Sequence, residues 1–278
     1  MSGIFYIIGT PIGNMEDITA RQIETLKSVD FVCAEDTRVT VKLFNRYGIK
    51  KPLVSFHGHS PRSAAEAIIS RIIGGENCGI VTDAGMPCIS DPGEVLVGMC
   101  AENGIDVKVV PGPSAVVSAV AVSGLPASRF MFEGFLPVNK KQRSERLKLL
   151  RNETGLMVFY EAPHKLRTTL GDLADFFGGD RRISLCRELT KVHEEVIRLT
   201  LSGAVDYYNT VEPRGEFVLV IEGKTEAGDE RITAEEALAR VENLVNMGEK
   251  PVNACKEVAK EYGFKKSDLY SAFCGKKK

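Results

Sequence analysis

The chain has 278 residues, 44% of them hydrophobic, which is enough to bury one or two large cores. Its 36 basic and 37 acidic residues leave a formal net charge of −1, which excludes a protein that attracts polyanions through its overall charge; any nucleic acid must be bound by a local patch. No apolar run approaches the roughly 18 residues of a membrane span and no signal-peptide pattern is present, so we expect a cytoplasmic protein with no membrane partner.

The seven cysteines are odd in number and contain no C-x-x-C pair. Four of them, Cys33, Cys78, Cys186 and Cys255, lie within apolar runs. We therefore expect buried, reduced thiols, with neither disulfides nor a metal site.

Strands and helices alternate over a first predicted domain, residues 1–122. An apolar run at 4–8 ends in the breaker-rich segment 9–14, and Thr19 with Gln22 forms a capping box that opens a helix. Further strands are predicted at 31–34, 53–56, 79–82 and 107–110, and further helices from about residue 40, over 61–73, after Pro92 and over 115–122. Such alternation predicts a mostly parallel sheet in an α/β fold.

Segments rich in glycine and proline follow three of these strands, after Ile8, Thr82 and Val110. Ligands of open α/β sheets bind where the carboxyl ends of strands meet, so the three loops predict one crevice. The loop after Thr82 is expected to end with Asp91 as the N-cap of a helix and Pro92 at its first position.

The first loop, residues 9–14, does not have the pattern of a phosphate-binding loop. Neither G-x-G-x-x-G nor G-x-x-x-x-G-K-[ST] is present, and Pro11 removes an N–H that a phosphate cradle would use. A ligand whose recognition does not depend on phosphates is favoured. S-adenosylmethionine is such a ligand, because main-chain groups, hydroxyls and carboxylates can hold its sulfonium, carboxylate, ribose and adenine.

A break at residues 123–126 begins a second predicted domain, 123–225, with short connections near Lys191 that favour a mixed sheet. Its strands are predicted at 130–135, 156–160, 183–187, 195–201 and 216–221, and its helices at 139–150, 163–177 and 204–209. A polar linker then leads into a helical tail, 226–278. Helices at 252–262 and 267–273 around a tight turn are typical of a helix-turn-helix unit or of a small capping bundle, and both interpretations stay open.

Seven short blocks occur in the same order as in a known family. They are residues 10–14 (Thr-Pro-Ile-Gly-Asn), 34–38, 82–85, 90–93, 111–115, 134–137 and 187–191. These blocks resemble the tetrapyrrole-methylase superfamily and, within it, the branch of ribosomal small-subunit RNA cytidine 2′-O-methyltransferases. Met86 departs from the pattern, which has a small residue there.

The resemblance implies a two-domain tetrapyrrole-methylase-like α/β fold with a small helical C-terminal appendix. It also implies a homodimer that binds S-adenosylmethionine between the two domains and methylates a ribose 2′-hydroxyl of a decoding-centre cytidine in 16S rRNA of the 30S subunit. A tetrapyrrole or diphthamide-type methyltransferase of the same fold is the nearest alternative. A non-catalytic RNA-binding protein, with purely structural glycine loops, is the alternative from another class.

We assign cofactor binding to residues in these loops and at the ends of the second set of strands. They are Thr10, Pro11, Ile12, Asp83, Ala84, Gly85, Ile89, Ser90, Asp91, Pro111, Ser114, Ala115, Tyr160 and Leu189. Asp83 is also the type of residue that caps turns, and Ser114 also fits a helix cap, so each has a structural alternative.

Two charged groups are candidates for catalysis. Glu35, Asp36 and Arg38 follow an apolar strand; either acid could accept the hydroxyl proton and Arg38 could meet a phosphate, although a surface ion-pair cluster explains them equally well. Glu188 and Lys191 follow another strand, and Lys191 could assist deprotonation if its pKa were lowered. A solvated hairpin tip is the alternative for this pair.

Two basic clusters are predicted to bind RNA, one at the domain junction and one in the tail. The predicted contacts are Lys140, Lys141, Arg143, Arg146, Lys265 and Lys266, with lysines 276–278 next to the second cluster. The chain has no tryptophan and 7% aromatic residues, which favours recognition of RNA shape and phosphates over a broad stacking platform.

Overall fold

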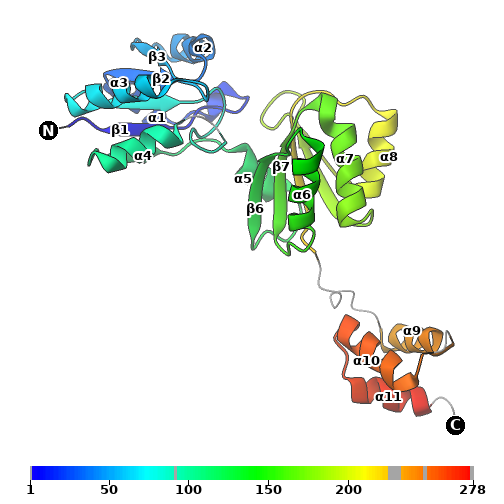
Figure 1. Cartoon of the computed structure of the whole chain (residues 1–278). Helices are drawn as coiled ribbons and strands as arrows, with labels where there is room; N and C mark the ends of the chain where they lie inside the picture. The colour runs from blue at the N-terminus through cyan, green and yellow to red at the C-terminus, as the bar shows by residue number, and fades with distance from the viewer. Residues whose placement is uncertain (1, 91–92, 225–232, 247–248, 276–278) are drawn as a thin grey trace. The chain divides into compact units, whose positions relative to one another are not determined.

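The computed structural model describes residues 2–90, 93–224, 233–246 and 249–275, and it divides into two compact units (Figure 1). The first unit comprises Met1–Lys148 with Leu156–Glu222 and contains both sheets. The second comprises Leu149–Gly155 with Gly223–Lys278. The exact boundaries of the three predicted domains stay a prediction.

The first sheet is parallel throughout, as predicted. Its strands run in the order β3-β2-β4-β1-β5, and all four pairings are parallel. The strands are β1 (Phe5–Ile8), β2 (Phe31–Ala34), β3 (Leu53–Ser55), β4 (Cys78–Val81) and β5 (Val107–Val110). Every residue of β2 and β4 is buried, which explains why these strands read as continuous apolar runs.

Four α-helices and one short 3-10 helix connect these strands. They are η1 (Met15–Asp17), α1 (Ala20–Ser28), α2 (Thr37–Tyr47), α3 (Arg62–Ile73) and α4 (Glu94–Glu102). The capping box of Thr19 and Gln22 is confirmed. Helix α2 begins three residues before the predicted start, because Asp36 is its N-cap.

The predicted cap of α4 is wrong. Asp91 and Pro92 lie outside the described residues, and the helix begins at Glu94 with Gly93 as its N-cap at a φ of 128°. A Cβ at Gly93 would come within 2.7 Å of the Cys88 sulfur, so close packing at a left-handed backbone position selects glycine here.

The second sheet is mixed, as predicted. Its strands are β6 (Phe130–Phe135), β7 (Leu156–Glu161), β8 (Arg182–Arg187), β9 (Glu195–Thr200) and β10 (Phe217–Ile221), in the order β6-β7-β10-β8-β9. The β6–β7 pair is parallel and the other pairs are antiparallel. The helices are α5 (Ala115–Val122), α6 (Lys140–Leu150), α7 (Pro163–Phe177) and α8 (Leu201–Thr210). Helix α5 packs on β10, and α7 packs beside α8.

The tail forms three helices around its own apolar cluster, which includes Val241, Val258 and Phe273. They are α9 (Ala234–Asn246), α10 (Pro251–Tyr262) and α11 (Lys266–Gly275). Most of the predicted polar linker, residues 225–232, and lysines 276–278 lie outside the described residues.

All seven cysteines are free thiols, and Cys33, Cys78, Cys186 and Cys255 are buried, as predicted. Within the described ranges, none of the helices has the length and apolar character to cross a membrane.

Candidate functional site

Three loops meet at the carboxyl end of the first sheet, where the sequence places a crevice. The loop after β1 pairs with the loop after β4, because the amide of Thr10 donates to the Gly85 carbonyl at 2.9 Å and the amide of Gly85 donates back at 3.2 Å. The loop after β5 lies against the first loop, where a Cβ on Gly9 would come within 2.8 Å of the Gly112 Cα. The three loops therefore form one surface.

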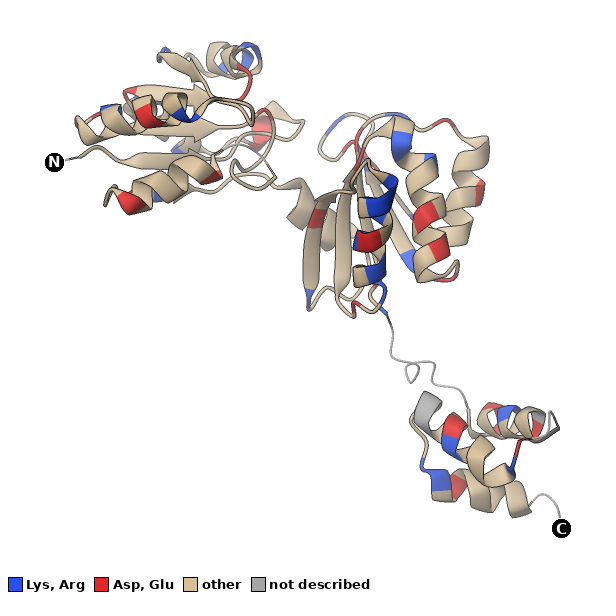
Figure 2. Ribbon diagram, viewed as in Figure 1, with Lys and Arg blue, Asp and Glu red and all other residues tan. Residues whose placement is uncertain are grey.

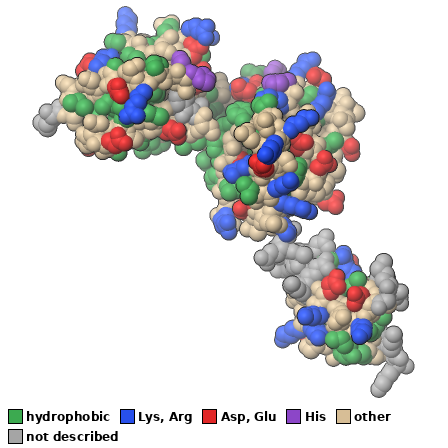
Figure 3. All heavy atoms as spheres, viewed as in Figure 1, with side chains coloured by type: hydrophobic (Ala, Val, Ile, Leu, Met, Phe, Trp, Pro, Cys, Tyr) green, Lys and Arg blue, Asp and Glu red, His purple; other side chains and the backbone are tan. Residues whose placement is uncertain are grey.

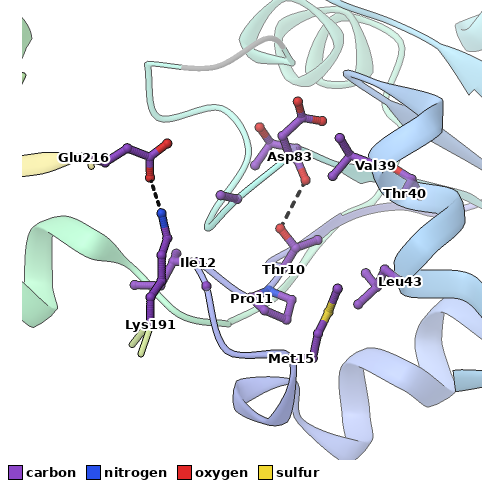
Figure 4. A pocket seen from close by; sticks show the side chains of 13 residues that line it. Thr10, Pro11, Ile12, Met15, Val39, Thr40, Leu43, Asp83, Lys191 and Glu216 are labelled. Carbon is purple, nitrogen blue, oxygen red and sulfur yellow. Dashed lines mark hydrogen bonds and ion pairs between the residues drawn. The ribbon is translucent and has the colours of Figure 1, made fainter. Parts of the chain in front are cut away.

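A cavity of about 300 Å³ opens beside the first two of these loops (Figure 4). Its wall includes α2 and two residues of the second half of the first unit. The lining residues are Thr10, Pro11, Ile12, Gly13, Met15, Val39, Thr40, Leu43, Thr82, Asp83, Ala84, Lys191 and Glu216. We call this space the first cavity; it lies at the lower end of the size range of small-molecule sites.

Strained backbone is concentrated in the loops around this site. Four described non-glycine residues have positive φ: Cys88 (69°), Ser90 (62°), Glu188 (51°) and Thr190 (65°). Two of them lie in the loop after β4 and two in the segment after β8. Such conformations cost of the order of 1–3 kcal/mol each and concentrate at ligand sites, so they support a functional role for both loops.

The loop after β1 contacts the segment after β8 closely. A Cβ on Gly13 would meet Lys191 Cγ at 2.5 Å, Thr190 Oγ1 at 2.8 Å and the Leu189 carbonyl at 3.1 Å. The amide of Asn14 donates to Thr190 Oγ1 at 3.1 Å. Glycine at position 13 thus lets the two chain segments approach, and the first cavity takes residues from both.

Lys191 is held between two carboxylates at the wall of the first cavity. Its Nζ donates to Glu216 Oε2 at 2.8 Å (Figure 4). It also donates to Glu188 Oε1 at 2.9 Å. Burial alone would lower the pKa of Lys191, but the hydrogen bonds to Glu216 and Glu188 outweigh it and the pKa is raised. The condition under which Lys191 was predicted to assist deprotonation is therefore not met.

The acidic group after β2 separates into residues with different properties. Asp36 caps α2 and pairs with Arg38 at 2.6 Å, and this ion pair with its hydrogen bonds lowers the pKa of Asp36 to about 2. So acidic a carboxyl is a weak base. Arg38 is 88% exposed, as the surface ion-pair interpretation expects. Glu35 instead points inward, and its Oε2 accepts from the Thr82 hydroxyl at 2.6 Å.

Asp83 stands at the entrance of the loop after β4 and lines the first cavity. Its Oδ1 accepts from the Asp36 amide at 3.1 Å. Loss of hydration raises the pKa of Asp83 in spite of that bond, and the neighbouring carboxylates of Glu35 and Asp36 raise it further. A carboxylate crowded in this way gains from a ligand that donates hydrogen bonds to it.

Four predicted cofactor residues lie in one apolar cluster. Ala115, Tyr160 and Ile12 pack as partly buried side chains against it, and Leu189 is a buried member. Tyr160 also stacks edge-on against Phe132 at a centroid distance of 4.8 Å. Since Ile12 also lines the first cavity, this cluster continues the cavity wall.

The remaining predicted cofactor residues lie outside the lining of the first cavity. Ile89 is 54% exposed, Pro111 is exposed, and Ser90 lines a second cavity, beside the turn after β3. Ser114 caps α5 by accepting from the Val117 amide at 3.5 Å, so its structural alternative is confirmed. Met86 packs against the first loop, with its sulfur 2.8 Å from where a Gly9 Cβ would be.

Lysine and arginine residues lie along α6 (Figure 2), and side chains of these types gather on the surface of this part of the molecule (Figure 3). The basic face of α6 is nevertheless smaller than the sequence indicates. Arg143 is 13% exposed and binds Asp172 at 2.5 Å, so it has little surface to offer to RNA. Arg146 pairs with Glu133 at 2.6 Å. Lys140 and Lys141 are exposed. In the tail, Lys265 and Lys266 are also exposed, where the turn after Gly263 meets α11.

Seven residues that line the first cavity were not among the predicted site residues: Gly13, Met15, Val39, Thr40, Leu43, Thr82 and Glu216. Two of them make polar contacts with predicted residues. Glu216 lies next to Lys191 because β10 pairs with β8, with Phe217 opposite Arg187. Thr82 was read as a strand residue, yet its hydroxyl reaches Glu35. A long-range strand register and the direction of a hydroxyl leave no local signal in a sequence.

The residues of the first cavity fit S-adenosylmethionine. Ile12, Val39 and Leu43 supply apolar surface, while Asp83 and Glu216 supply carboxylates suited to hydroxyl or ammonium donors. The left-handed Gly85, whose Cβ would come to 3.3 Å of Ile12, keeps the loop wall thin. Over the described residues, no three or more His, Cys, Asp or Glu are placed to hold a metal ion.

Comparison with known proteins supports the predicted resemblance. The family model of tetrapyrrole (corrin/porphyrin) methylases matches residues 5–205. The ribosomal RNA small subunit methyltransferase I of Halalkalibacterium halodurans is 42% identical over 274 residues, covering 98% of this chain and 94% of that protein. The protein of the same name from Thermotoga maritima is 48% identical over 222 residues, covering 80% of this chain and 99% of that protein.

Solved structures of low identity share the fold. The methyltransferase CobJ matches with a TM-score of 0.62 at 18% identity, over 80% of this chain and 95% of that one. A uroporphyrin-III C-methyltransferase from Thermus thermophilus complexed with S-adenyl homocysteine matches with a TM-score of 0.56 at 16% identity, over 79% of this chain and 97% of that one. The chain therefore belongs to the tetrapyrrole (corrin/porphyrin) methylase family, in the group of the ribosomal RNA small subunit methyltransferase I proteins.

Proposed function

We propose that the protein is an S-adenosylmethionine-dependent methyltransferase of small-subunit ribosomal RNA that acts on the ribose 2′-hydroxyl of a cytidine in the decoding centre. The observation that carries the proposal is the sequence match over 98% of the chain to a relative with that RNA in its name. The seven ordered blocks, which resemble the cytidine 2′-O-methyltransferase branch, support the nucleotide and the atom.

The first cavity is the proposed donor site. Asp83 would accept hydrogen bonds from the donor, the main chain at Thr10 and Ala84 would approach it closely, and the apolar cluster around Tyr160 would cover its uncharged parts. When bound, S-adenosylmethionine supplies an electrophilic methyl group on a sulfonium. The protein then contributes mainly by holding an acceptor hydroxyl in line with that group.

Glu35 is the proposed acceptor of the hydroxyl proton. Asp36 is too acidic, and Lys191 keeps its proton because Glu188 and Glu216 raise its pKa. Glu35 Oε2 accepts at 2.6 Å from the hydroxyl of Thr82, a residue that lines the first cavity, and this bond fixes the carboxylate. A carboxylate fixed in this way would act as a general base on an acceptor hydroxyl bound within hydrogen-bond distance of it.

Lys191, Glu188 and Glu216 are proposed as positioning residues. Their ion pairs and the amide of Glu216, which donates to Glu188 Oε1 at 2.9 Å, hold the strained segment after β8 against the residue that precedes β10. Thr190 in that segment accepts from the Asn14 amide of the loop after β1 at 3.1 Å. The proposed RNA contacts are Lys140, Lys141, Arg146, Lys265 and Lys266. Arg143 is withdrawn from that set because its side chain is largely buried. We further propose a cytoplasmic homodimer.

Labelled methyl transfer tests the proposed function. Purified 30S subunits that lack the modification are incubated with the protein and labelled S-adenosylmethionine, and the RNA is digested to nucleosides for mass spectrometry. We expect 2′-O-methylcytidine as the labelled product. Label in a different nucleoside would refute the assigned acceptor, and label in a tetrapyrrole or a protein, with none in RNA, would favour the alternative methyltransferases of this fold.

A further inference from the structure

A second cavity, of about 640 Å³, lies beside the turn after β3. Among the predicted cofactor residues that the structure describes, Ser90 alone lines it. Its lining includes the turn after β3, the first turn of α3 and the first turn of α4. Its polar and charged lining residues are Glu35, His57, His59, Ser60, Arg62, Ser90 and Glu94. The proposed function uses Glu35 from this lining but gives no role to the turn after β3 or to Arg62.

Hydrogen-bond donors are concentrated in the turn after β3. His57 Nδ1 accepts from the His59 amide at 3.2 Å, so the neutral ring carries its proton on Nε2, which is then a donor. The His57 amide donates to Ser60 Oγ at 2.9 Å and the Ser60 amide donates to the His57 carbonyl at 2.8 Å, which fixes the turn. The histidines therefore sit on an ordered turn although their side chains are exposed.

Positive charge is added where this turn enters α3. Arg62 is 83% exposed and makes one ion pair, to Glu66 at 3.2 Å through Nε. Helix α3 has Pro61 as its N-cap and no side-chain hydrogen bond there. The Ala64 amide donates to the Pro61 carbonyl at 2.9 Å, and the two amides before it, of Arg62 and Ser63, add further donors. A guanidinium, imidazole N–H groups and helix amides together suit a phosphate oxygen.

One hydrogen bond joins the second cavity to the first. Thr82 lines the first cavity and donates from its hydroxyl to Glu35 Oε2 at 2.6 Å, while Glu35 lines the second cavity. Phe56 and Ala65 give the second cavity a buried apolar floor. A ligand in it would thus have cationic donors at the exposed turn and a carboxylate at the wall shared with the donor site.

We propose that the second cavity binds the acceptor segment of the RNA, with a backbone phosphate at His57, His59 and Arg62 and the reacting ribose toward Glu35. The inference rests on the proposed function and adds the place and the chemistry of acceptor binding. The volume lies within the range of small-molecule sites and has room for a nucleotide. A single-stranded segment suits an exposed pocket of this kind, because its bases and sugars are free to turn into it.

The histidine rings provide a direct test of binding that does not depend on methyl transfer. The chain has four histidines, and His164 on α7 serves as an internal reference. The probe is an RNA trinucleotide with cytidine at its centre, and the ring resonances are followed by NMR. We expect the His57 and His59 signals to shift while those of His164 do not. Unchanged cavity signals, or the same shifts with an equal concentration of inorganic phosphate, would overturn the proposal, the latter by indicating an adventitious ion only.

Methyl-transfer kinetics provide the second test. The combined variant His57→Gln, His59→Gln, Arg62→Gln is expected to raise KM for 30S subunits by about tenfold or more, with a smaller effect on kcat and an unchanged Kd for S-adenosylmethionine. His164→Gln is the matched control, for which we expect wild-type constants.

Failure of this inference and failure of the proposed function give different results. Wild-type methylation of 30S subunits with an unchanged KM in the combined variant would refute acceptor binding in the second cavity and leave the activity standing. Histidine shifts with the trinucleotide in a protein that transfers no methyl to 30S subunits would refute the activity and support a nucleotide site.

Discussion

Replacing Lys191 by methionine tests whether the charged group at the first cavity stabilises the fold. The change removes an ammonium that lies 2.9 Å from Glu188 Oε1 and 2.8 Å from Glu216 Oε2. The Glu216 side chain is 80% exposed, so solvent screens that contact and it contributes little. Lys191 and Glu188 are 30% and 19% exposed, and losing one charged partner of a mostly buried carboxylate should lower the free energy of unfolding by about 1–2 kcal/mol.

The loss should depend on pH in a defined direction. Burial would raise the pKa of Glu188, but the Glu216 amide and Lys191 outweigh it and the pKa is lowered, so this contribution is present above the unfolded value and lost as pH falls through the folded one. The pKa of Lys191 is raised, so its contribution is present below the unfolded value and lost as pH rises through the folded one. The cost of Lys191→Met should therefore be greatest between about pH 5 and about pH 10.

Urea unfolding followed by circular dichroism at about pH 7 and about pH 3.5 measures this cost. Lys42→Met, at an exposed lysine on α2, is the matched control and should change stability by less than about 0.5 kcal/mol. Adding Glu188→Gln to Lys191→Met should cost less than the two single changes together, because they remove the same interaction. An equal loss at both pH values, or none near neutrality, would show that the ion pair does not act as argued.

Three further outcomes are expected. Asp83→Asn should weaken S-adenosylmethionine binding about tenfold in calorimetry, and unchanged affinity would remove Asp83 from the donor site. The melting temperature should stay the same or rise, because folding raises the pKa of Asp83 and its ionised form therefore lowers stability at pH values above the pKa of the unfolded chain. Lys140→Glu with Lys141→Glu should weaken RNA binding and make it less sensitive to salt, with donor affinity preserved; an unaltered salt dependence would contradict the assigned contact. A chain ending after Glu222 should keep its donor affinity, since the matched Thermotoga maritima protein has about that length; a loss of binding would give the tail a part in the site.

Most helices and strands could be predicted because their signals are local. Helix α7 has its predicted bounds, Pro163–Phe177, since a proline opens it and Gly178 follows it at a φ of 93°. The start of α4 was predicted incorrectly because Asp91 has a side chain that can cap a helix and Gly93 has none. In the structure Gly93 is nevertheless the N-cap. The cap is decided there by close packing against Cys88, which composition does not reveal.

The site was predictable as a set of loops and only partly as a set of contacts. Asp83 and Thr10 follow strands whose parallel order brings their ends together, so their common position follows from the fold class. The properties of charged residues did not follow in the same way. Lys191 was expected to assist deprotonation if its pKa were lowered, but the antiparallel register of β10 places Glu216 beside it and raises the pKa instead.

The strained residues explain why so much of this site lies where sequence propensity fails. Left-handed backbone is expected at glycine, yet Ser90 and Thr190 adopt it. Ser90 lines the second cavity, and the Thr190 hydroxyl accepts a hydrogen bond from the Asn14 amide. Each such residue lowers the free energy of unfolding, and the conformation persists only where the surrounding structure holds it in place. The fully buried strands β2 and β4 provide that support next to these loops. Thr82 directly follows β4, and its hydroxyl holds the Glu35 carboxylate between the two cavities. The same sheet therefore positions both the proposed donor site and the proposed acceptor site.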